Sequence, residues 1–373
     1  MKLYQALILI VLFGHSLFSD AQVKNMMGQL KPHSSFTILQ YHHISDRTPS
    51  ITSTLPEIFE EHLKYINEKH KVITLENALD AVKNDFPMPS NSVVITFDDG
   101  YLSIFENAHT LLKKYNMPYT VFINPDEIGR SHLQLNWQQI KEMKPLATFA
   151  NHTLDHIHLV EKIANETDEM WLTRIIQNIQ SAEKKIESQL GYSKKWLAYP
   201  YGEFNAQLKN ALLKLGYVGF AQHSGAVNID SDFGALPRFP AAGIYANLDT
   251  LKVKMKSLPM PIAETSIHDP VMSVGEALHS FTVKTLPLKH WSANLSASDM
   301  KFDSIACYFK GESIPVVTQN NTTDIEMNVT LAHTFGPGRI RVNCTAPSKS
   351  LKGRYYWYSQ PFFVPTEKGK FLE

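Results

Sequence analysis

The amino-acid sequence predicts a parallel α/β sheet or barrel followed by a small all-β sandwich. From residue 35 to residue 258, short apolar runs typical of buried strands alternate with amphipathic stretches typical of helices, an alternation that indicates a parallel α/β fold. Beyond Pro259 and Pro261 the helical periodicity ends and short β-rich runs follow. The 373 residues, of which 43% are hydrophobic and 19% are charged, suffice for two domains.

The first elements are predicted from their end signals. The apolar run at 35–44 is a strand that ends in two histidines, and the strand from Val93 ends at a turn through Gly100. Pro56 in a first helical turn, with the hydroxyl of Thr54 as a cap, predicts the start of a helix.

The remaining α/β elements follow from apolar periodicity. Gly191 and Gly216 are predicted to end two of the helices. Helices are expected at 75–83, 103–115, 137–143, 167–190, 204–215 and 248–258, and strands at 119–123, 147–150, 196–199 and 217–221.

The C-terminal part is predicted to be a β-sandwich of about 95 residues, which is within the usual range for such a domain. Its expected strands lie at 281–283, 305–309, 327–331, 340–342 and 355–358 with 362–364. The expected boundaries are 31–260 for the α/β domain and 268–366 for the sandwich. The run at 355–358 either stacks on sugar rings or supplies one core face and one tyrosine-rich exposed face. We expect an Ig-like packing or spacer domain.

The N-terminus carries a predicted signal peptide at residues 1–21. Lys2 precedes an apolar run that begins at Ala6, and Ser19-Asp20-Ala21 places small residues at the cleavage positions. An uncleaved anchor is the alternative, but the run is shorter than the ~20 residues that span a bilayer. We therefore expect export to the periplasm or the extracellular space, with no later membrane span.

Charge and cysteine content narrow the function classes. Lys plus Arg and Asp plus Glu are both 36, so no global field would attract nucleic acid or an acidic membrane, and we expect a neutral or weakly charged partner. Cys307 and Cys344 are the two cysteines. In an exported protein they either form one disulfide across the β-domain or remain two buried thiols.

Two groups of polar residues follow strands in the α/β region. Asp98 and Asp99 come directly after the Val93 strand, where the turn at Gly100 allows both carboxylates to face one cleft; a solvated turn is the alternative. His152 and His156 lie four residues apart after another strand, a spacing that suits two ligands of one metal. Chance spacing is the alternative for this pair, because the chain has 16 histidines.

Three motifs, in order, resemble those of a known family. Thr96-Phe-Asp-Asp-Gly100, His152-Thr-Leu-Asp-His156 and Tyr199-Pro-Tyr-Gly202 resemble the first three motifs of the polysaccharide deacetylases, the NodB-homology group of carbohydrate esterases. The resemblance covers about residues 36–258 and implies a distorted (β/α) barrel of the NodB-homology type, with the site at the C-terminal ends of its strands.

The resemblance also implies roles for individual residues. Asp99, His152 and His156 would ligate one divalent ion, most often zinc. Such an ion lowers the pKa of bound water towards ~7 and polarises a carbonyl group. Asp98 would accept the proton of the attacking water, and the backbone N–H of Tyr201 would help to hold the oxyanion.

Cleavage of an amide also requires an acid that protonates the departing amine. The family's late Leu-x-His motif has no clear equivalent here; the nearest text, Ile267-His268-Asp269, is predicted to be a spacer. The first strand, Leu39-Gln-Tyr-His-His43, resembles the permuted arrangement of poly-N-acetylglucosamine deacetylases. We therefore predict His42 as the acid, with His43 on the opposite face. A strand-end histidine bonded to the backbone is the alternative.

Candidate substrate contacts are Pro200, Gln222, His223 and Arg238, and Arg238 is also a candidate to orient Asp98. Each is equally compatible with a structural role in a loop. The arginine that usually precedes Pro-Tyr-Gly and the tryptophan of the fourth family motif are absent, and these departures concern substrate contacts more than hydrolysis.

Taken together, the motifs predict an exported, metal-dependent hydrolase that removes acetyl groups from an N-acetylhexosamine glycan. The expected substrates, in order, are poly-β-1,6-N-acetylglucosamine, chitin-type oligomers and peptidoglycan glycan. One alternative is an amidase that acts on a non-sugar amide. The other is a non-catalytic glycan-binding protein, which the presence of Asp98 and all three expected ligands argues against.

Overall fold

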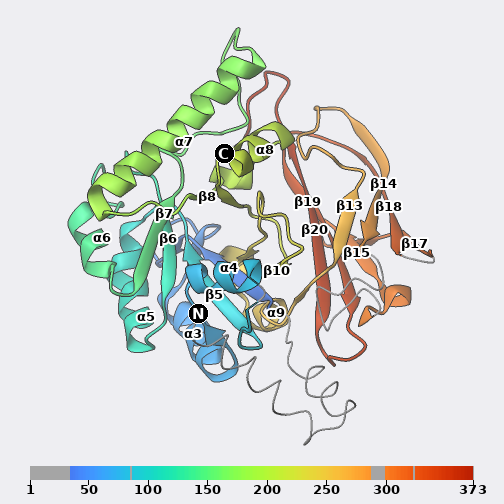
Figure 1. The fold of residues 1–373 in the computed structure, drawn as a ribbon, viewed down its shortest axis with the longest axis horizontal. Helices are drawn as coiled ribbons and strands as arrows, with labels where there is room; N and C mark the ends of the chain where they lie inside the picture. The colour runs from blue at the N-terminus through green and yellow to red at the C-terminus, as the bar shows by residue number, and fades with distance from the viewer. Residues whose placement is uncertain (1–33, 85, 287–298, 322–323, 373) are drawn as a thin grey trace, which may run out of the picture.

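The computed structural model describes residues 34–84, 86–286, 299–321 and 324–372. The predicted signal peptide at residues 1–21 lies outside this part of the chain. Within the described ranges, no helix combines the length and apolarity needed to cross a bilayer. Figure 1 shows a mixed α/β part and an all-β part lying side by side.

A curled sheet, nine-stranded among the described residues, forms the α/β part. Its six main strands are parallel and lie side by side in chain order: β1 (Phe36–Tyr41), β5 (Ser92–Phe97), β6 (Tyr119–Ile123), β7 (Ala147–Asn151), β8 (Trp196–Ala198) and β9 (Val218–Phe220). The short strands are β4 (Lys71–Val72), β10 (Ala226–Val227) and β11 (Phe239–Pro240), and a separate pair is β2 (His43–Ile44) with β3 (Ser53–Thr54). Leu236 forms a β-bridge with Phe220 of β9, and β11, which follows shortly after Leu236 in the chain, pairs with β1. Residues 236–240 therefore join the last main strand to the first. The predicted parallel barrel is confirmed.

The strands are buried on both faces, as a parallel sheet requires. Val93 and Ile95 of β5 share a core with Phe59 on the outer side. On the opposite face, Phe122 and Phe220 of the non-adjacent strands β6 and β9 lie 5.2 Å apart between ring centroids, which fills the barrel interior.

The longer helices of the α/β part follow the predicted order. The helices of this part are α3 (Pro56–Lys69), α4 (Leu75–Lys83), η1 (Ile104–His109) with α5 (Thr110–Lys114), α6 (Trp137–Met143), α7 (Asp168–Leu190), η2 (Pro200–Gly202), α8 (Ala206–Lys214), η3 (Gly243–Ala246) and α9 (Leu248–Lys254). Gly191, at φ 80°, ends α7 as predicted.

Two local predictions were wrong. Thr54 does not cap α3: Leu55 occupies the N-cap position, and the Thr54 hydroxyl donates to the Ala241 carbonyl at 2.8 Å. The helix expected at 248–258 ends at Lys254, and Leu258 already belongs to the strand β12 (Leu258–Pro259) of the all-β part. In both cases a contact with a distant segment outweighs the local signal.

Two sheets form the all-β part, and their strands are antiparallel except where β12 pairs with β20 (Tyr355–Val364) in parallel. One contains β12, β20, β19 (Gly338–Pro347), β15 (Ala306–Phe309) and β16 (Glu312–Ile314), and the other contains β13 (Ile262–Thr265), β14 (Ala277–Thr285), β18 (Ile325–Thr334) and β17 (Val316–Asn320); a short η5 (Phe302–Ser304) precedes β15. Residues of both sheets share one core, so the predicted sandwich is confirmed. Cys307 and Cys344 form a disulfide between β15 and β19.

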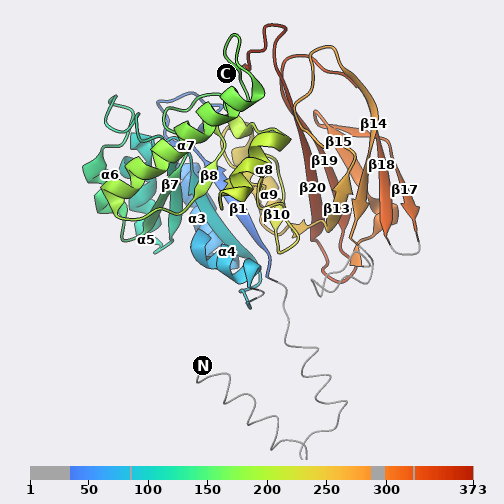
Figure 2. The same cartoon turned by 45° about the horizontal axis from the view of Figure 1, so that its top comes forward.

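The sandwich packs against the barrel through β19 and β20, which face it in Figures 1 and 2. The ring of Trp357 lies edge-on to Phe239 with centroids 5.3 Å apart. Arg341 donates to the Gln222 carbonyl at 2.8 Å. The two parts therefore meet near the loops that follow the barrel strands.

Candidate active site

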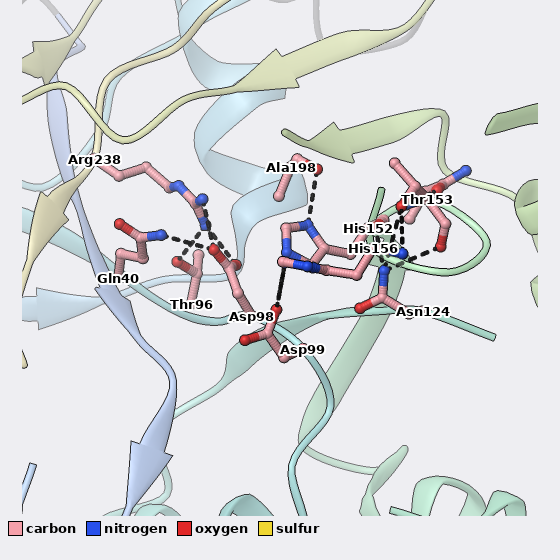
Figure 3. A network of polar contacts seen from close by, with 11 residues as sticks. Gln40, Thr96, Asp98, Asp99, Asn124, His152, Thr153, His156, Ala198 and Arg238 are labelled. Atoms are coloured by element: carbon pink, nitrogen blue, oxygen red, sulfur yellow. Dashed lines mark hydrogen bonds and ion pairs between the residues drawn. The ribbon is translucent and has the colours of Figure 1, made fainter. Parts of the chain in front are cut away.

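The backbone turns sharply where β5 ends. The Asp98 N–H still bonds the Tyr41 carbonyl at 3.0 Å, whereas Asp99 and Gly100 have positive φ angles of 71° and 69°. A Cβ at Gly100 would lie 3.1 Å from the Ile123 side chain, so this position requires glycine. The turn directs both carboxylates to the same region at the C-terminal end of the barrel (Figure 3).

Asp99 meets the two histidines of the second motif. Its Oδ1 lies 3.0 Å from Nε2 of His152 and 3.3 Å from Nε2 of His156, and the three candidate ligand atoms all lie within 4.8 Å of one another. His152 directly follows β7. The Thr153 hydroxyl accepts the His156 N–H at 3.1 Å, and Asn124 donates to the Thr153 carbonyl at 3.3 Å.

The proton positions in this cluster fit a bound cation. Nδ1 of His152 lies 2.8 Å from the Ala198 carbonyl, which only accepts, so Nδ1 carries a proton and Nε2 is the ring atom directed at Asp99. Asp99 Oδ1 is buried and faces Nε2 of both imidazole rings. Two imidazole nitrogens and one carboxylate oxygen that converge in this way are a donor set suited to zinc.

Asp98 lies beside this cluster and has no exposed surface. Arg238 contacts its two oxygens at 2.7 and 2.8 Å, and Gln40 donates to Oδ2 at 2.7 Å. Burial by itself would raise the pKa of Asp98, but Arg238 outweighs burial and the pKa lies below its usual value. Asp98 is therefore ionised at neutral pH and is able to accept a proton.

Arg238 is completely buried. Its Nε donates to the Ala221 carbonyl at 2.9 Å and its guanidinium lies 5.4 Å from the Phe122 ring centroid. Of the two roles considered for Arg238, this geometry favours orientation of Asp98 over direct contact with a sugar.

The two histidines after β1 have different surroundings. His42 is half-buried and lies close enough to Asp98 and Asp99 to interact with both carboxylates. His43 stacks on Tyr101 with ring centroids 3.6 Å apart. Burial lowers the pKa of His43 to about 4, so His43 is neutral where a general acid would need a proton. This difference favours His42 for that role.

Comparisons with known proteins agree with these motifs. The family model of the polysaccharide deacetylases matches residues 86–220. YxkH of Bacillus subtilis (strain 168), which carries the name of a polysaccharide deacetylase, is 31% identical over 206 residues, spanning 54% of this chain and 69% of YxkH. The chain belongs to the polysaccharide deacetylase family.

Further relatives of this deacetylase include an enzyme of Staphylococcus aureus (strain MRSA252) named poly-β-1,6-N-acetyl-D-glucosamine N-deacetylase. It is 31% identical over 188 residues, and the match spans 48% of this chain and 64% of the staphylococcal protein. The chain thus covers less than two thirds of that relative.

Solved structures share the barrel fold of this deacetylase. The Streptococcus pyogenes deacetylase PplD has a TM-score of 0.52 at 23% identity, covering 60% of this chain and 99% of PplD. IcaB of Ammonifex degensii has a TM-score of 0.52 at 21% identity, covering 60% of this chain and 98% of IcaB. Both comparisons therefore extend over the barrel part.

The third deacetylase motif lies next to His156. Tyr201 has a left-handed backbone with φ 57° and ψ 2°, and its ring lies edge-on to His156 with centroids 4.6 Å apart. Pro200 is buried beside it. A Cβ at Gly202 would lie 2.7 Å from Cβ of Gln222, so this turn requires glycine. The ring of Tyr201 thus lies beside a predicted metal ligand.

Gln222 and His223 line a cleft together with Tyr201 and residues of the sandwich. The structure therefore brings Asp98, Asp99, His42, His152, His156 and Tyr201 to one site, while Gln222 and His223 lie in the adjoining cleft.

Sequence reasoning missed four polar residues of the site. Gln40 had a signal, since it is a polar residue in the otherwise apolar strand β1. Glu203 bonds His158 at 2.8 Å and pairs with Arg339 of the sandwich at 3.0 Å. His158 in turn stacks on Tyr201 with centroids 4.0 Å apart. The contact of Glu203 with Arg339 depends on how the two domains pack, which no local pattern encodes.

Proposed function

We propose that this protein is an exported, metal-dependent N-deacetylase of N-acetylhexosamine glycans. The observation that carries the proposal is the convergence of Asp99, His152 and His156, with ligand atoms within 4.8 Å of one another, next to the buried, ionised carboxylate of Asp98. A bound divalent ion, for which zinc is our first candidate, would supply an acidic water and polarise the acetamide carbonyl.

The chain's own residues would perform the proton transfers. Asp98, held by Arg238 and Gln40, accepts the proton of the water that attacks the acetamide carbon. The backbone N–H of Tyr201 stabilises the oxyanion that develops on the acetamide oxygen. His42 donates a proton to the nitrogen as the C–N bond breaks, so that acetate and a free amine leave.

The proposed substrates follow the relatives and the motif order. Poly-β-1,6-N-acetylglucosamine comes first because the staphylococcal relative carries that activity in its name, and the histidine after β1 has the same order as in the deacetylases of that polymer. Chitin-type oligomers and peptidoglycan glycan follow. The predicted signal peptide and the disulfide of Cys307 with Cys344 support export to an oxidising compartment.

Acetate release tests this proposal. We expect metal-loaded protein to release acetate from at least one N-acetylglucosamine polymer, chelated protein to release none, and Asp98→Asn to bind metal without turnover. Activity on small non-sugar amides alone would favour an amidase. Glycan binding that survives Asp98→Asn, without acetate release from the native protein, would favour a non-catalytic binding protein.

A further inference from the structure

A cleft of about 660 Å³ lies between the barrel and the sandwich. It begins at Tyr201, whose ring also contacts His156, and continues past Gln222 and Tyr245 to residues of β15, β19 and β20. A chain bound with one unit at the candidate metal site would therefore place neighbouring units in this cleft.

The cleft has an uneven charge. Among the described residues, four cationic side chains line it and no carboxylate does: Lys254, Lys310, Arg339 and Arg341. Arg339 is paired with Glu203, which has no exposed surface. The other three lack an ion-pair partner in the described part of the chain. Such a concentration is unexpected in a chain with 36 basic and 36 acidic residues.

Two of these cations contact a single aromatic ring. Nζ of Lys254 lies 5.0 Å, and Cζ of Arg341 lies 5.4 Å, from the ring centroid of Tyr245. Burial, and secondarily Arg341, lowers the pKa of Lys254 to about 8. Holding two like charges together without a counter-charge is unfavourable, and an anionic ligand would remove this cost.

Aromatic side chains in the same cleft offer surfaces for sugar rings. Tyr245 and Tyr308 are both 39% exposed, and the half-buried Trp357 also lines the cleft. Flat aromatic faces next to basic groups that donate hydrogen bonds suit a saccharide with acidic substituents, since the faces contact the rings and the cations contact the charges.

We propose that this cleft binds an anionic glycan, so that the substrate is an N-acetylhexosamine polymer whose other units carry carboxylate or sulfate groups. This inference rests on the proposed deacetylase function, and it ranks acidic N-acetylhexosamine polymers ahead of the neutral poly-β-1,6-N-acetylglucosamine and chitin-type oligomers. It replaces the neutral partner that we expected from the net charge, because equal numbers of basic and acidic residues in the whole chain do not exclude a local excess of basic residues in this cleft. Each deacetylation step converts an acetamide into an ammonium group, which the basic cleft repels. Deacetylated stretches of the polymer therefore dissociate from the cleft more readily than acetylated ones.

Calorimetric titration of full-length Asp98→Asn with oligosaccharides tests the inference without turnover. We expect oligomers of N-acetylglucosamine alternating with glucuronic acid, or their sulfated counterparts, to bind at least about tenfold more tightly than neutral N-acetylglucosamine oligomers of the same length. Higher salt should reduce this difference. The acidic series that binds more tightly, carboxylated or sulfated, identifies the anionic group that the cleft prefers.

Variants locate the effect. In the Asp98→Asn background, Lys254→Gln together with Lys310→Gln should remove most of the preference for acidic oligomers. Lys352 is an exposed lysine of the sandwich outside the cleft, and Lys352→Gln should leave the preference unchanged. If the double variant unfolds, the exposed Lys310→Gln alone should still weaken acidic binding several-fold.

The outcomes separate this inference from the proposed function. Equal binding of neutral and acidic oligomers overturns the inference even if native protein deacetylates neutral polymers. Preferential acidic binding without acetate release from any polymer supports the cleft assignment and contradicts the deacetylase proposal. Equally tight binding of single-stranded RNA of matched charge would mean that the cleft selects charge without sugar, and would also overturn the inference.

Discussion

Arg238 holds both carboxylate oxygens of Asp98, at 2.7 and 2.8 Å, and neither side chain has any exposed surface. The two residues are separated by 140 positions in the chain. A buried charge pair of this kind fixes the carboxylate in one orientation and keeps it ionised, provided that both partners remain.

Arg238→Lys should therefore impair both stability and turnover. Lysine keeps the charge but cannot bond both oxygens in the same planar geometry, and we expect a loss of about 3 kcal/mol in the free energy of unfolding. Because the folded-state pKa of Asp98 is lowered, the pair stabilises the protein above the usual carboxyl pKa and this contribution is lost as the pH falls through the folded value. Acid unfolding of metal-free protein should thus begin at higher pH in the variant.

Arg130→Lys is the matched control for this prediction. Arg130 pairs with Glu127 at 2.9 Å, and both side chains are accessible to solvent, so such a pair contributes at most about 1 kcal/mol. Urea unfolding at pH 7 measures both variants. Equal losses in the two variants would contradict the assigned importance of the buried pair.

The sequence allowed the catalytic end of the barrel to be predicted because its signals are local. Strand ends of a parallel barrel meet at one edge, so Asp98 and His152 were expected to lie together from motif order alone. Glu203 and Arg339 gave no such signal, since their contact joins the barrel to the sandwich. Thr54 shows the converse: its capping signal was clear, but the Ala241 carbonyl takes its hydroxyl.

His152→Ala should abolish metal binding. The variant removes one of three converging ligand atoms, and we expect zinc affinity to fall by more than about 100-fold, beyond the loss caused by removing an outer hydrogen bond. Asp98→Asn should retain the metal, because Asp98 is engaged by Arg238 instead. The metal content after dialysis and isothermal calorimetric titration with zinc measure metal binding by both variants.

His132→Ala is a suitable control, since His132 is exposed and lies outside the cluster. It should bind zinc as the native protein does. Native-like zinc affinity in His152→Ala would remove this histidine from the ligand set.

His42→Gln should separate two kinds of substrate. If His42 protonates the departing amine, kcat on an N-acetylglucosamine oligomer should fall about 100-fold or more. When an aryl acetate ester is hydrolysed, the departing phenolate is a good leaving group that does not need to be protonated. Hydrolysis of such an ester by His42→Gln should therefore be nearly as fast as by the native protein. Asp98→Asn should abolish both reactions, because both require activation of water. Equal losses on the two substrates in His42→Gln would show that this side chain is not the acid.

The sandwich should influence turnover through the contact of Arg339 with Glu203. Glu203 is buried, bonds His158 at 2.8 Å and pairs with Arg339 at 3.0 Å. The guanidinium of Arg339 also lies 5.0 Å from the Tyr201 ring centroid. Because Tyr201 is predicted to position the oxyanion, loss of this support should lower kcat more than it raises KM.

A double-mutant cycle with Glu203→Gln and Arg339→Gln measures that support. We expect each single variant to reduce kcat, and the double variant to lose little more than either one, which corresponds to a coupling of about 1–2 kcal/mol. The unfolding midpoint, recorded in parallel, separates loop positioning from general destabilisation. If the two losses in kcat add fully, Glu203 and Arg339 act independently and the sandwich does not position the Tyr201 loop through this pair.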